Sequence, residues 1–285
     1  MMNELKVKEK LTEFLIEDIG CGDLTTSSLA NKDQWIQGHF ISKEDGLFAG
    51  EEIIKLGFSL ISKDTEVILF KHDGDRIVKG DIIASVKGTF STLMAGERVI
   101  LNLVQRMSGI ATMTNEFVHI LDGSGIRICD TRKVMPGLKI FDKYAVTCGG
   151  GYNHRFGLYD GVMLKDNHVA AVGSTGAAIR EVRKRVGHMI RVEVEIETEE
   201  ALLQAVEAKA DIIMFDNRSP EEIKSWMRHV PNHIVTEVSG GITLENIHQY
   251  RETGVNYISI GALTHSVSGL DISFNIASQK EGEGK

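Results

Sequence analysis

The sequence predicts an α/β protein, with an N-terminal α+β domain followed by an incomplete, open α/β barrel. Short apolar β-type runs alternate with amphipathic helical stretches from about residue 126 to residue 262. Polar or glycine residues end each of these runs, and a βα barrel builds its active site from such positions. Only six runs are present, fewer than the eight strands of a complete barrel, so we expect the barrel to be open.

The N-terminal part mixes helices and strands. Apolar spacing predicts helices over 5–19 and 51–62, and alternation predicts a strand over 35–42. Two β-rich runs flank Asp73–Gly74, which is a hairpin signal. The longest helical pattern spans 92–121, and Ser108–Gly109 in its middle predicts a break or domain junction. We therefore expect one domain of residues 1–108 joined by 266–285, and a barrel domain of residues 109–265.

The barrel part shows the βα alternation most clearly. Its β-type runs begin near residues 126, 161, 190, 211, 233 and 256, and helical stretches separate several of them. This order implies parallel strands joined by right-handed crossovers. The polar strand ends are Asp130–Lys133, Lys165–His168, Glu195, Asp216–Asn217, Ser239–Gly241 and Gly261–Ala262.

Composition narrows the class of protein. The chain has 285 residues and a net charge of −8, which argues against nucleic-acid binding as the main activity. The three cysteines are far apart and form no CxxC pair, as expected in a reducing compartment. No apolar run approaches the roughly 20 residues that cross a bilayer, and no signal-peptide pattern opens the chain. We expect a cytoplasmic globular protein.

Residues 127–168 carry a net positive charge, whereas the chain as a whole is negatively charged. This stretch holds seven Lys or Arg against four Asp, together with His154, His168 and the Gly149–Gly151 run. Lysine and arginine supply charge and forked hydrogen bonds, and glycines let backbone amides approach a ligand. The pattern favours a site for a polyanion over a solvated basic surface.

Two further patterns point to the same edge of the barrel. Alternation places Glu193 and Glu195 on one side of a strand, which faces either solvent or the barrel mouth. In the mouth, Glu195 and Asp216 would offer the oxygen ligands that Mg²⁺ accepts, or would bind a sugar hydroxyl. The glycine-bearing strand ends 238–242 and 258–265 are typical of phosphate binding through backbone amides.

Several residues allow more than one interpretation. Lys165 ends an apolar strand and would suit a Schiff base, although so many cations indicate an anionic ligand more simply. His154 and His168 would suit roles as metal ligands, general acids or hydrogen-bond donors, but no HxxxH or similar spacing supports a transition-metal site. Arg98 and Arg106 lie among apolar residues of a helix, a pattern more often seen for residues at the rim of a core.

The long motifs resemble those of one family. The segments ERVILNLVQRMSGIAT, DTRKVMPGLK, KYAVTCGGGYNHRFGLYDGVMLKDNH, VEVE, DN, VSGGI and GALTHS occur in this order and resemble the quinolinate phosphoribosyltransferases, also called carboxylating nicotinate-nucleotide pyrophosphorylases. The resemblance spans about Gly80 to Asp271. Where the family usually reads DTRKTTPGLR, this chain has Val134, Met135 and Lys139 in place of two threonines and an arginine.

The resemblance implies a fold and an activity. The fold would be an N-terminal α+β sandwich domain with an open α/β barrel of the seven-stranded type. The enzyme would transfer phosphoribosyl from phosphoribosyl pyrophosphate to quinolinate and release pyrophosphate and CO₂, giving nicotinate mononucleotide for NAD synthesis. It would use Mg²⁺ and no organic cofactor, and neither nucleic acid nor membrane would be a partner. It would form a homodimer, or a higher oligomer, in which one N-terminal domain covers the partner's barrel mouth.

The resemblance also implies roles for single residues. Arg98 would reach quinolinate in the neighbouring subunit, and Glu195 and Asp216 would engage the ribose and Mg²⁺-pyrophosphate. Lys133 and Lys165, with Glu195 and Asp216, would be catalytic. The quinolinate carboxylates and the phosphates would contact Arg132, Lys133, His154, Arg155 and Lys165. The 5′-phosphate would lie against Ser239, Gly240, Gly241, Ile260, Gly261 and Ala262.

Three rival functions remain open at this point. The first is a related phosphoribosyltransferase-like protein of the kind associated with molybdenum transport, whose members tend to lack the NHR and KDNH segments present here. The second is a Schiff-base aldolase or decarboxylase acting through Lys165. The third is a binder of phosphoribosyl ligands without catalysis.

Overall fold

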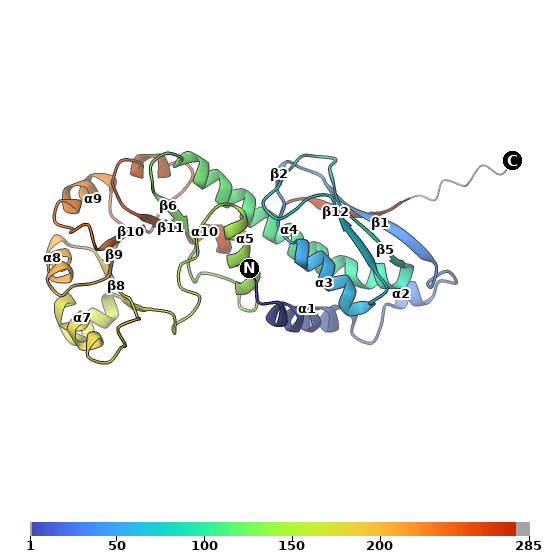
Figure 1. Cartoon of the computed structure of the whole chain (residues 1–285), viewed down its shortest axis with the longest axis horizontal. Coiled ribbons are helices and arrows are strands. Elements are labelled where there is room, and N and C mark those ends of the chain that lie inside the picture. The colour runs from blue at the N-terminus through green and yellow to red at the C-terminus, as the bar shows by residue number, and fades with distance from the viewer. Residues whose placement is uncertain (1, 278–285) are drawn as a thin grey trace. The chain divides into compact units, whose positions relative to one another are not determined.

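The computed structural model describes residues 2–277, which form two compact units (Figure 1). The first unit contains the chain up to residue 113, residues 135–150 and the chain from residue 267. The second contains residues 114–134 and 151–266. These units differ from the expected domains chiefly at residues 135–150, which we had placed in the barrel domain.

Specific contacts explain why residues 135–150 belong with the first unit. This segment carries helix α5 (Lys139–Cys148), whose Asp142 is fully buried and receives two hydrogen bonds from Arg106, of 2.7 and 2.9 Å. The Tyr144 hydroxyl donates to Asp73 Oδ2 at 2.7 Å. A buried carboxylate needs such charged partners, so α5 stays with the residues that supply them. Arg106 is therefore an internal ion-pair partner and not a residue at the rim.

An antiparallel sheet organises the first unit. Its strands follow the order β12 (Ile272–Ile276), β1 (Trp35–Ser42), β5 (Ile82–Thr89) and β3 (Glu66–Leu69). The two β-rich runs that flank Asp73–Gly74 pair with each other, because β3 is antiparallel to β5. Their connection is longer than a tight turn and contains β4 (Arg76–Ile77), which pairs with β2 (Gly46–Leu47). Phe40, Phe58 and Phe274 contact one another in the core, with ring centroids 4.9–6.2 Å apart.

Helices of this unit begin and end where the sequence indicates. In α1 (Glu4–Ile19), the Asn3 side chain accepts the amide hydrogen of Lys6, and Gly20 ends the helix at a φ of 52° that favours glycine. The short α2 (Leu24–Ser27) follows, capped by Asp23. Helix α3 (Glu51–Ile61) buries Ile53, Ile54 and Phe58. The predicted helices over 5–19 and 51–62 and the strand over 35–42 are confirmed.

The predicted break at Ser108–Gly109 is wrong, because α4 (Phe90–Ile120) is continuous across it. The small residues serve close packing instead. Ser108 is fully buried and its hydroxyl accepts from the Ala49 amide at 3.1 Å. A Cβ at Gly109 would lie 2.1 Å from the carbonyl oxygen of Ser268. The helix therefore keeps a glycine here because another backbone segment lies against it.

Replacing Gly109 with alanine is expected to lower the free energy of unfolding of the first unit by about 1–3 kcal/mol, because the new methyl group meets backbone that cannot move aside. The gain in helix propensity, about 1 kcal/mol, opposes this only in part. The midpoint of thermal unfolding measures the change. Gly187→Ala is the control, since a Cβ there has no atom within 4 Å. Equal midpoints for the two variants would contradict the packing argument.

A parallel sheet organises the second unit. Its order is β6 (Arg127–Cys129), β11 (Tyr257–Ser259), β10 (Val235–Ser239), β9 (Ile212–Asp216), β8 (Val192–Ile196) and β7 (Val162–Leu164). The six predicted strands are confirmed. The barrel is open because β6 and β7 are the two edge strands of the sheet and do not pair with each other among the described residues. Beside β6, a single parallel bridge joins Cys129 to Tyr152, in the place where a seventh strand would pair.

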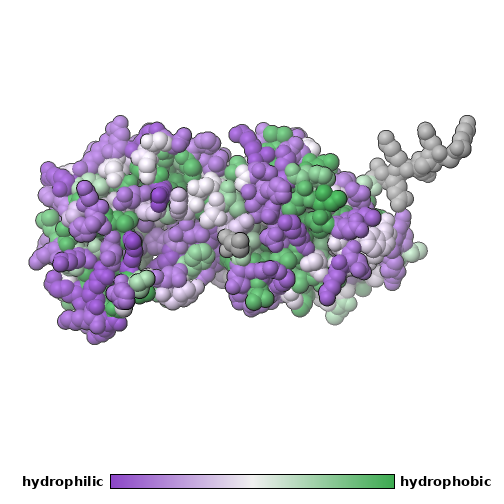
Figure 2. All heavy atoms as spheres, viewed as in Figure 1, coloured by the Kyte–Doolittle hydropathy of each residue, from purple (hydrophilic) through white to green (hydrophobic). Residues whose placement is uncertain are grey.

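Helices cover the outer side of the curved sheet (Figure 1). They are α7 (Thr175–Arg183), α8 (Glu199–Glu207) and α9 (Pro220–Met227), each opened by a Ser or Thr side chain that accepts a backbone N–H. The connections also hold α6 (Asp166–Val172), the 3₁₀ turn η1 (Ile247–Tyr250) and α10 (Ala262–His265). Hydrophilic residues prevail over α7 and α8 (Figure 2). Within residues 2–277, no helix combines the length and apolarity needed to cross a membrane.

Candidate active site

The second unit has a cavity of about 520 Å³ where its parallel strands end. Register explains the convergence, because Ser239 lies beside Asp216 on one side and beside Ser259 on the other. The carboxyl ends of parallel strands meet at one edge of a sheet, so residues distant in sequence face one space. The lining contains Thr131, Arg132, Lys133, His154, Arg155, Met163, Lys165, Glu195, Met214, Asp216, Asn217, Ser239, Gly240, Gly241 and Ser259.

Four cations, Arg132, Lys133, Arg155 and Lys165, line this cavity. Burial lowers the pKa of Arg155, and the nearby positive charge of Arg132 lowers it further. Lys165 Nζ lies 2.5 Å from Glu195 Oε1. An anionic ligand would relieve the repulsion among the cations, so the cavity suits a polyanion.

Two carboxylates face the same space. Glu195 is the last residue but one of β8 and its side chain is 17% exposed, and Asp216 ends the neighbouring β9. Asp216 Oδ2 accepts from Asn217 Nδ2 at 2.9 Å. These oxygen donors on adjacent strands fit Mg²⁺, which takes one or two carboxylates together with substrate phosphate oxygens.

The glycine-bearing end of β10 is shaped by backbone geometry. Gly240 and Gly241 have φ values of 98° and 65°, and a Cβ at Gly240 would lie 2.1 Å from Asn217 Oδ1. Only glycine fits there, and its absence of a side chain leaves the strand end open to the cavity. After β11, the lining ends at Ser259, so Ile260, Gly261 and Ala262 follow directly but lie outside it. Their role in phosphate binding stays a prediction.

Two other singled-out residues lie elsewhere. Arg98 belongs to α4 in the first unit, with its side chain 60% exposed and a weak pairing of 3.8 Å to Glu97. His168 lies in α6, where its Nδ1 accepts the backbone N–H of Lys165 at 3.0 Å. His168 therefore supports the start of a helix at the strand end that carries Lys165.

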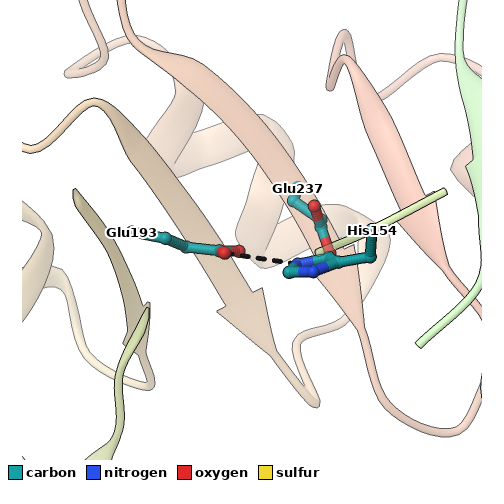
Figure 3. Close-up of side chains that lie close together, drawn as sticks. All are labelled: His154, Glu193 and Glu237. Atoms are coloured by element: carbon teal, nitrogen blue, oxygen red, sulfur yellow. Dashed lines mark ion pairs between the residues drawn. The ribbon is translucent and has the colours of Figure 1, made fainter. Parts of the chain in front are cut away.

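Sequence reasoning singled out His154 and Glu193 but missed Glu237, which completes a buried cluster with them (Figure 3). His154 Nε2 lies 3.2 Å from Glu193 Oε2 and 3.5 Å from Glu237 Oε1. Both glutamates are 4–5% exposed. Their positions carry a signal, because alternation puts Glu193 on the side of Glu195 and Glu237 on the side of Ser239. The sequence alone left open whether that side faces solvent, and the structure places it inside the barrel.

Burial, followed by the charge of Glu193, raises the pKa of Glu237 from 4.5 to about 7. The folded state therefore holds this proton more tightly than the unfolded state does. As the pH rises from about 4.5 to 7, the free energy of unfolding falls, and above about 7 the loss is complete.

Glu237→Gln removes this ionisation. The free energy of unfolding of the variant, minus that of the wild type, is therefore expected to increase as the pH rises from 5 to 8. This difference is expected to change by at most about 1.4 kcal/mol per pH unit. Urea unfolding of both proteins at several pH values measures it, with the exposed Glu207→Gln as the control. A difference between variant and wild type that does not change with pH would refute the assignment.

A second cavity, of about 480 Å³, lies at the other end of the same strands. Its lining includes strand-starting residues such as Val162 and Tyr257, and it shares His154 and Arg155 with the first cavity. The two shared residues therefore lie between two spaces inside the barrel.

An open α/β barrel with clustered cations, two carboxylates and a glycine-bearing strand end defines the class of barrel enzymes that bind phosphorylated substrates. Comparison with known proteins identifies the family. The profile of the quinolinate phosphoribosyl transferase C-terminal domain matches residues 110–275, and that of the N-terminal domain matches residues 23–108. The chain belongs to the quinolinate phosphoribosyltransferase family.

Individual relatives agree over nearly the whole chain. The chain is 53% identical to a probable carboxylating nicotinate-nucleotide pyrophosphorylase of Bacillus subtilis, covering 98% of this chain and 96% of the relative. It is 39% identical to a decarboxylating quinolinate phosphoribosyltransferase of Nicotiana tabacum, covering 95% and 82%. Among solved structures, NadC from Streptococcus pyogenes superposes with a TM-score of 0.92 at 37% identity, covering 98% and 99%.

Proposed function

We propose that this protein is an enzyme of NAD synthesis that transfers phosphoribosyl to quinolinate and decarboxylates the product. The products are nicotinate mononucleotide, pyrophosphate and CO₂. The observation that carries the proposal is the cavity, in which four cations, two carboxylates and a glycine-bearing strand end face one space. Quinolinate and phosphoribosyl pyrophosphate are both polyanions, and one cavity has to hold both.

The residues have distinct tasks in the transfer step. The pyridine nitrogen of quinolinate attacks C1 of the ribose, and the bond from C1 to pyrophosphate breaks. Negative charge grows on the leaving oxygens, where Lys133 and Lys165 stabilise it. Positive charge grows on the ribose, where Glu195 and Asp216 stabilise it. Placing opposite charges on neighbouring strand ends lets one rigid sheet serve both ends of the breaking bond.

The decarboxylation uses the catalytic groups that already serve the transfer step. After transfer, the pyridinium nitrogen draws electrons from the ring, so C2 tolerates the electron pair left when the adjacent carboxylate departs as CO₂. A proton then binds the electron pair at C2, in the place of the lost carboxylate. The cations Arg132 and Arg155 hold the substrate carboxylates in place during this step. We propose that no organic cofactor takes part, because the substrate accepts the electrons itself.

The assembly and the metal belong to the same proposal. Bound Mg²⁺ would neutralise pyrophosphate charge, held by Glu195 and Asp216 together with substrate oxygens. We propose a homodimer, or a higher oligomer of dimers, in which Arg98 enters the partner's barrel mouth. The exposure of Arg98 and its weak pairing with Glu97, at 3.8 Å, support a role outside its own unit. We also propose a cytoplasmic location, which suits cysteines that are present as thiols, namely Cys21, Cys129 and Cys148.

Turnover of the two substrates tests the function. Quinolinate, phosphoribosyl pyrophosphate and Mg²⁺ are expected to give CO₂ and nicotinate mononucleotide in equal amounts, while nicotinate, the control, gives no CO₂. Binding of phosphoribosyl pyrophosphate without pyrophosphate release would favour a non-catalytic binder. Trapping of a carbonyl substrate on Lys165 by borohydride would favour a Schiff-base enzyme.

A further inference from the structure

Asn217 follows the last residue of β9 and has a backbone conformation that is unusual for a residue with a side chain. Its φ is 53°, in the left-handed region, where asparagine is one of the few tolerated residues besides glycine. Lys209 also has a positive φ, of 58°, but it follows the end of α8, where helices commonly adopt this conformation. Asn217 instead lines the first cavity, with an exposed side chain. Its conformation therefore points to a role in the site.

The backbone of Asn217 extends the pairing of β9 with β10 by one residue. The ladder ends where Asp216 lies beside Ser239, and the Asn217 N–H then donates to the Ser239 carbonyl at 2.8 Å. The positive φ turns the chain directly after this bond. The turn is also held by Arg218, whose Nε donates to the Asp216 carbonyl at 3.0 Å. Residues 216–218 are therefore fixed relative to the end of β10.

The side chain of Asn217 contacts both neighbouring strand ends. Nδ2 donates to Asp216 Oδ2 at 2.9 Å, which fixes the rotation of that carboxylate. Oδ1 lies against Gly240, in the space that a Cβ of residue 240 would take. On the other side of the glycines, Asn246 Nδ2 donates to the Gly241 carbonyl at 2.7 Å. Asn217 thus joins an acid on β9 to the glycine-bearing end of β10.

The sheet by itself does not set the spacing between these two groups. Asp216 is the last paired residue of β9, and Gly240 and Gly241 lie beyond the last paired residue of β10. Glycine has more backbone freedom than any other residue, and these two have φ values of 98° and 65°. Such a turn keeps one conformation only if other groups hold it, and the Asn217 side chain is one of those groups.

We infer that Asn217 is a positioning residue for the phosphoribosyl group, which holds Asp216 and the Gly240–Gly241 turn at one fixed spacing. This rests on the proposed function, in which Asp216 engages the ribose and the end of β10 holds the 5′-phosphate. In the substrate, a few covalent bonds set the distance between the ribose hydroxyls and the 5′-phosphate. The two binding groups have to match that distance, and if they are not ordered in advance, the cost of ordering them weakens binding.

Three substitutions separate the side chain of Asn217 from its backbone conformation. Asn217→Gly removes the side chain and accepts the positive φ, whereas Asn217→Ala removes it and strains the backbone. Asn217→Asp keeps the shape but places a carboxylate, in place of the amide donor, beside Asp216. Each is expected to raise the Kd of phosphoribosyl pyrophosphate, measured by titration calorimetry with Mg²⁺, by about tenfold or more. The KM for quinolinate is expected to change less than about threefold.

Asn217→Gly is the most informative variant, because it is expected to keep the wild-type midpoint of thermal unfolding. A wild-type Kd in this variant would show that only the backbone conformation matters, and would overturn the inference. Equal increases in the Kd of phosphoribosyl pyrophosphate and in the KM for quinolinate would also overturn it, because general damage to the barrel affects both substrates.

Asn256→Ala is the matched control. Asn256 Oδ1 accepts the Thr236 N–H at 2.8 Å near the start of the strands, and Asn256 is absent from the lining of the first cavity. Its replacement is expected to lower the midpoint of thermal unfolding and to leave the Kd unchanged. An increase in Kd as large as that of Asn217→Gly would show that any lost backbone contact in the barrel weakens binding, and would overturn the inference.

A double-mutant cycle tests whether Asn217 acts through Asp216. In the Asp216→Ala background, Asn217→Gly is expected to raise the Kd of phosphoribosyl pyrophosphate by a smaller factor than in the wild type, because the carboxylate that it orients is gone. Factors that simply multiply would overturn the inference, since they would show two independent contacts.

Binding and turnover together keep this inference distinct from the proposed function. A wild type that binds phosphoribosyl pyrophosphate but releases no pyrophosphate would refute the proposed function, while the Kd values still decide the role of Asn217. Normal turnover in the wild type, with wild-type Kd values in all three variants, would overturn the inference and leave the proposed function standing. A wild type that binds no phosphoribosyl pyrophosphate would overturn both.

Discussion

Replacing Lys165 with methionine is expected to lower kcat by about 10²–10³-fold, the cost of removing one preorganised group that stabilises charge in a transition state. The loss has two parts. The leaving pyrophosphate loses a cation, and Glu195 loses the ammonium that lies 2.5 Å away. Steady-state release of pyrophosphate measures the change. Methionine keeps most of the side chain's length and apolar stem, so the substitution removes mainly the charge.

Lys184→Met is the matched control, because Lys184 is an exposed lysine in the same unit and is absent from the cavity lining. It is expected to behave like the wild type. If Lys165→Met also kept wild-type turnover, Lys165 would have no catalytic role. The ion pair with Glu195 already argues against the Schiff-base alternative, because that chemistry needs an unprotonated amine.

The second large effect concerns Arg98. Arg98→Ala is expected to reduce kcat/KM for quinolinate by roughly 100-fold, because a desolvated charge-assisted contact to a carboxylate is worth several kcal/mol. Mixing Arg98→Ala subunits with Lys165→Ala subunits should then restore activity. In each mixed dimer one barrel has its own Lys165 and the partner's Arg98, while the other site has neither. Activity per mixed dimer should approach about half that of the wild type.

Subunit exchange has to be verified by mass or by tagged purification before the rates are compared. Arg76→Ala, another exposed arginine of the first unit, is the control and is expected to leave quinolinate kinetics unchanged. Verified mixed dimers without recovery would show that each site is built from one chain. Unchanged kinetics in Arg98→Ala itself would remove Arg98 from the site.

Much of the barrel was predictable because its signals are local. Apolar runs, helical spacing and capping residues lie within a few positions of the element they define, and six parallel strands appeared where expected. The polar strand ends were predictable for the same reason, and Arg132, Lys165, Glu195 and Asp216 do meet in one cavity. Parallel connection fixes which strand ends share an edge, so chain order alone brings them together.

The errors share one cause, which is contact with residues far away in sequence. Ser108–Gly109 was predicted to break a helix, whereas the glycine accommodates the backbone at Ser268. Helix α5 was assigned by its place in the chain, whereas Arg106 and Asp73 hold it in the other unit. Neither partner is visible in the local pattern.

By itself, the sequence determined the element types, the parallel order of the barrel and the set of cations and acids at its strand ends, because periodicity and strand polarity are properties of short segments. Only the tertiary structure decided that Glu193 and Glu237 face inward and meet His154. Alternation says which residues share a side of a strand, but burial of that side depends on sheet closure. Once the side is buried, its charges must pair, and that requirement placed a histidine between two glutamates.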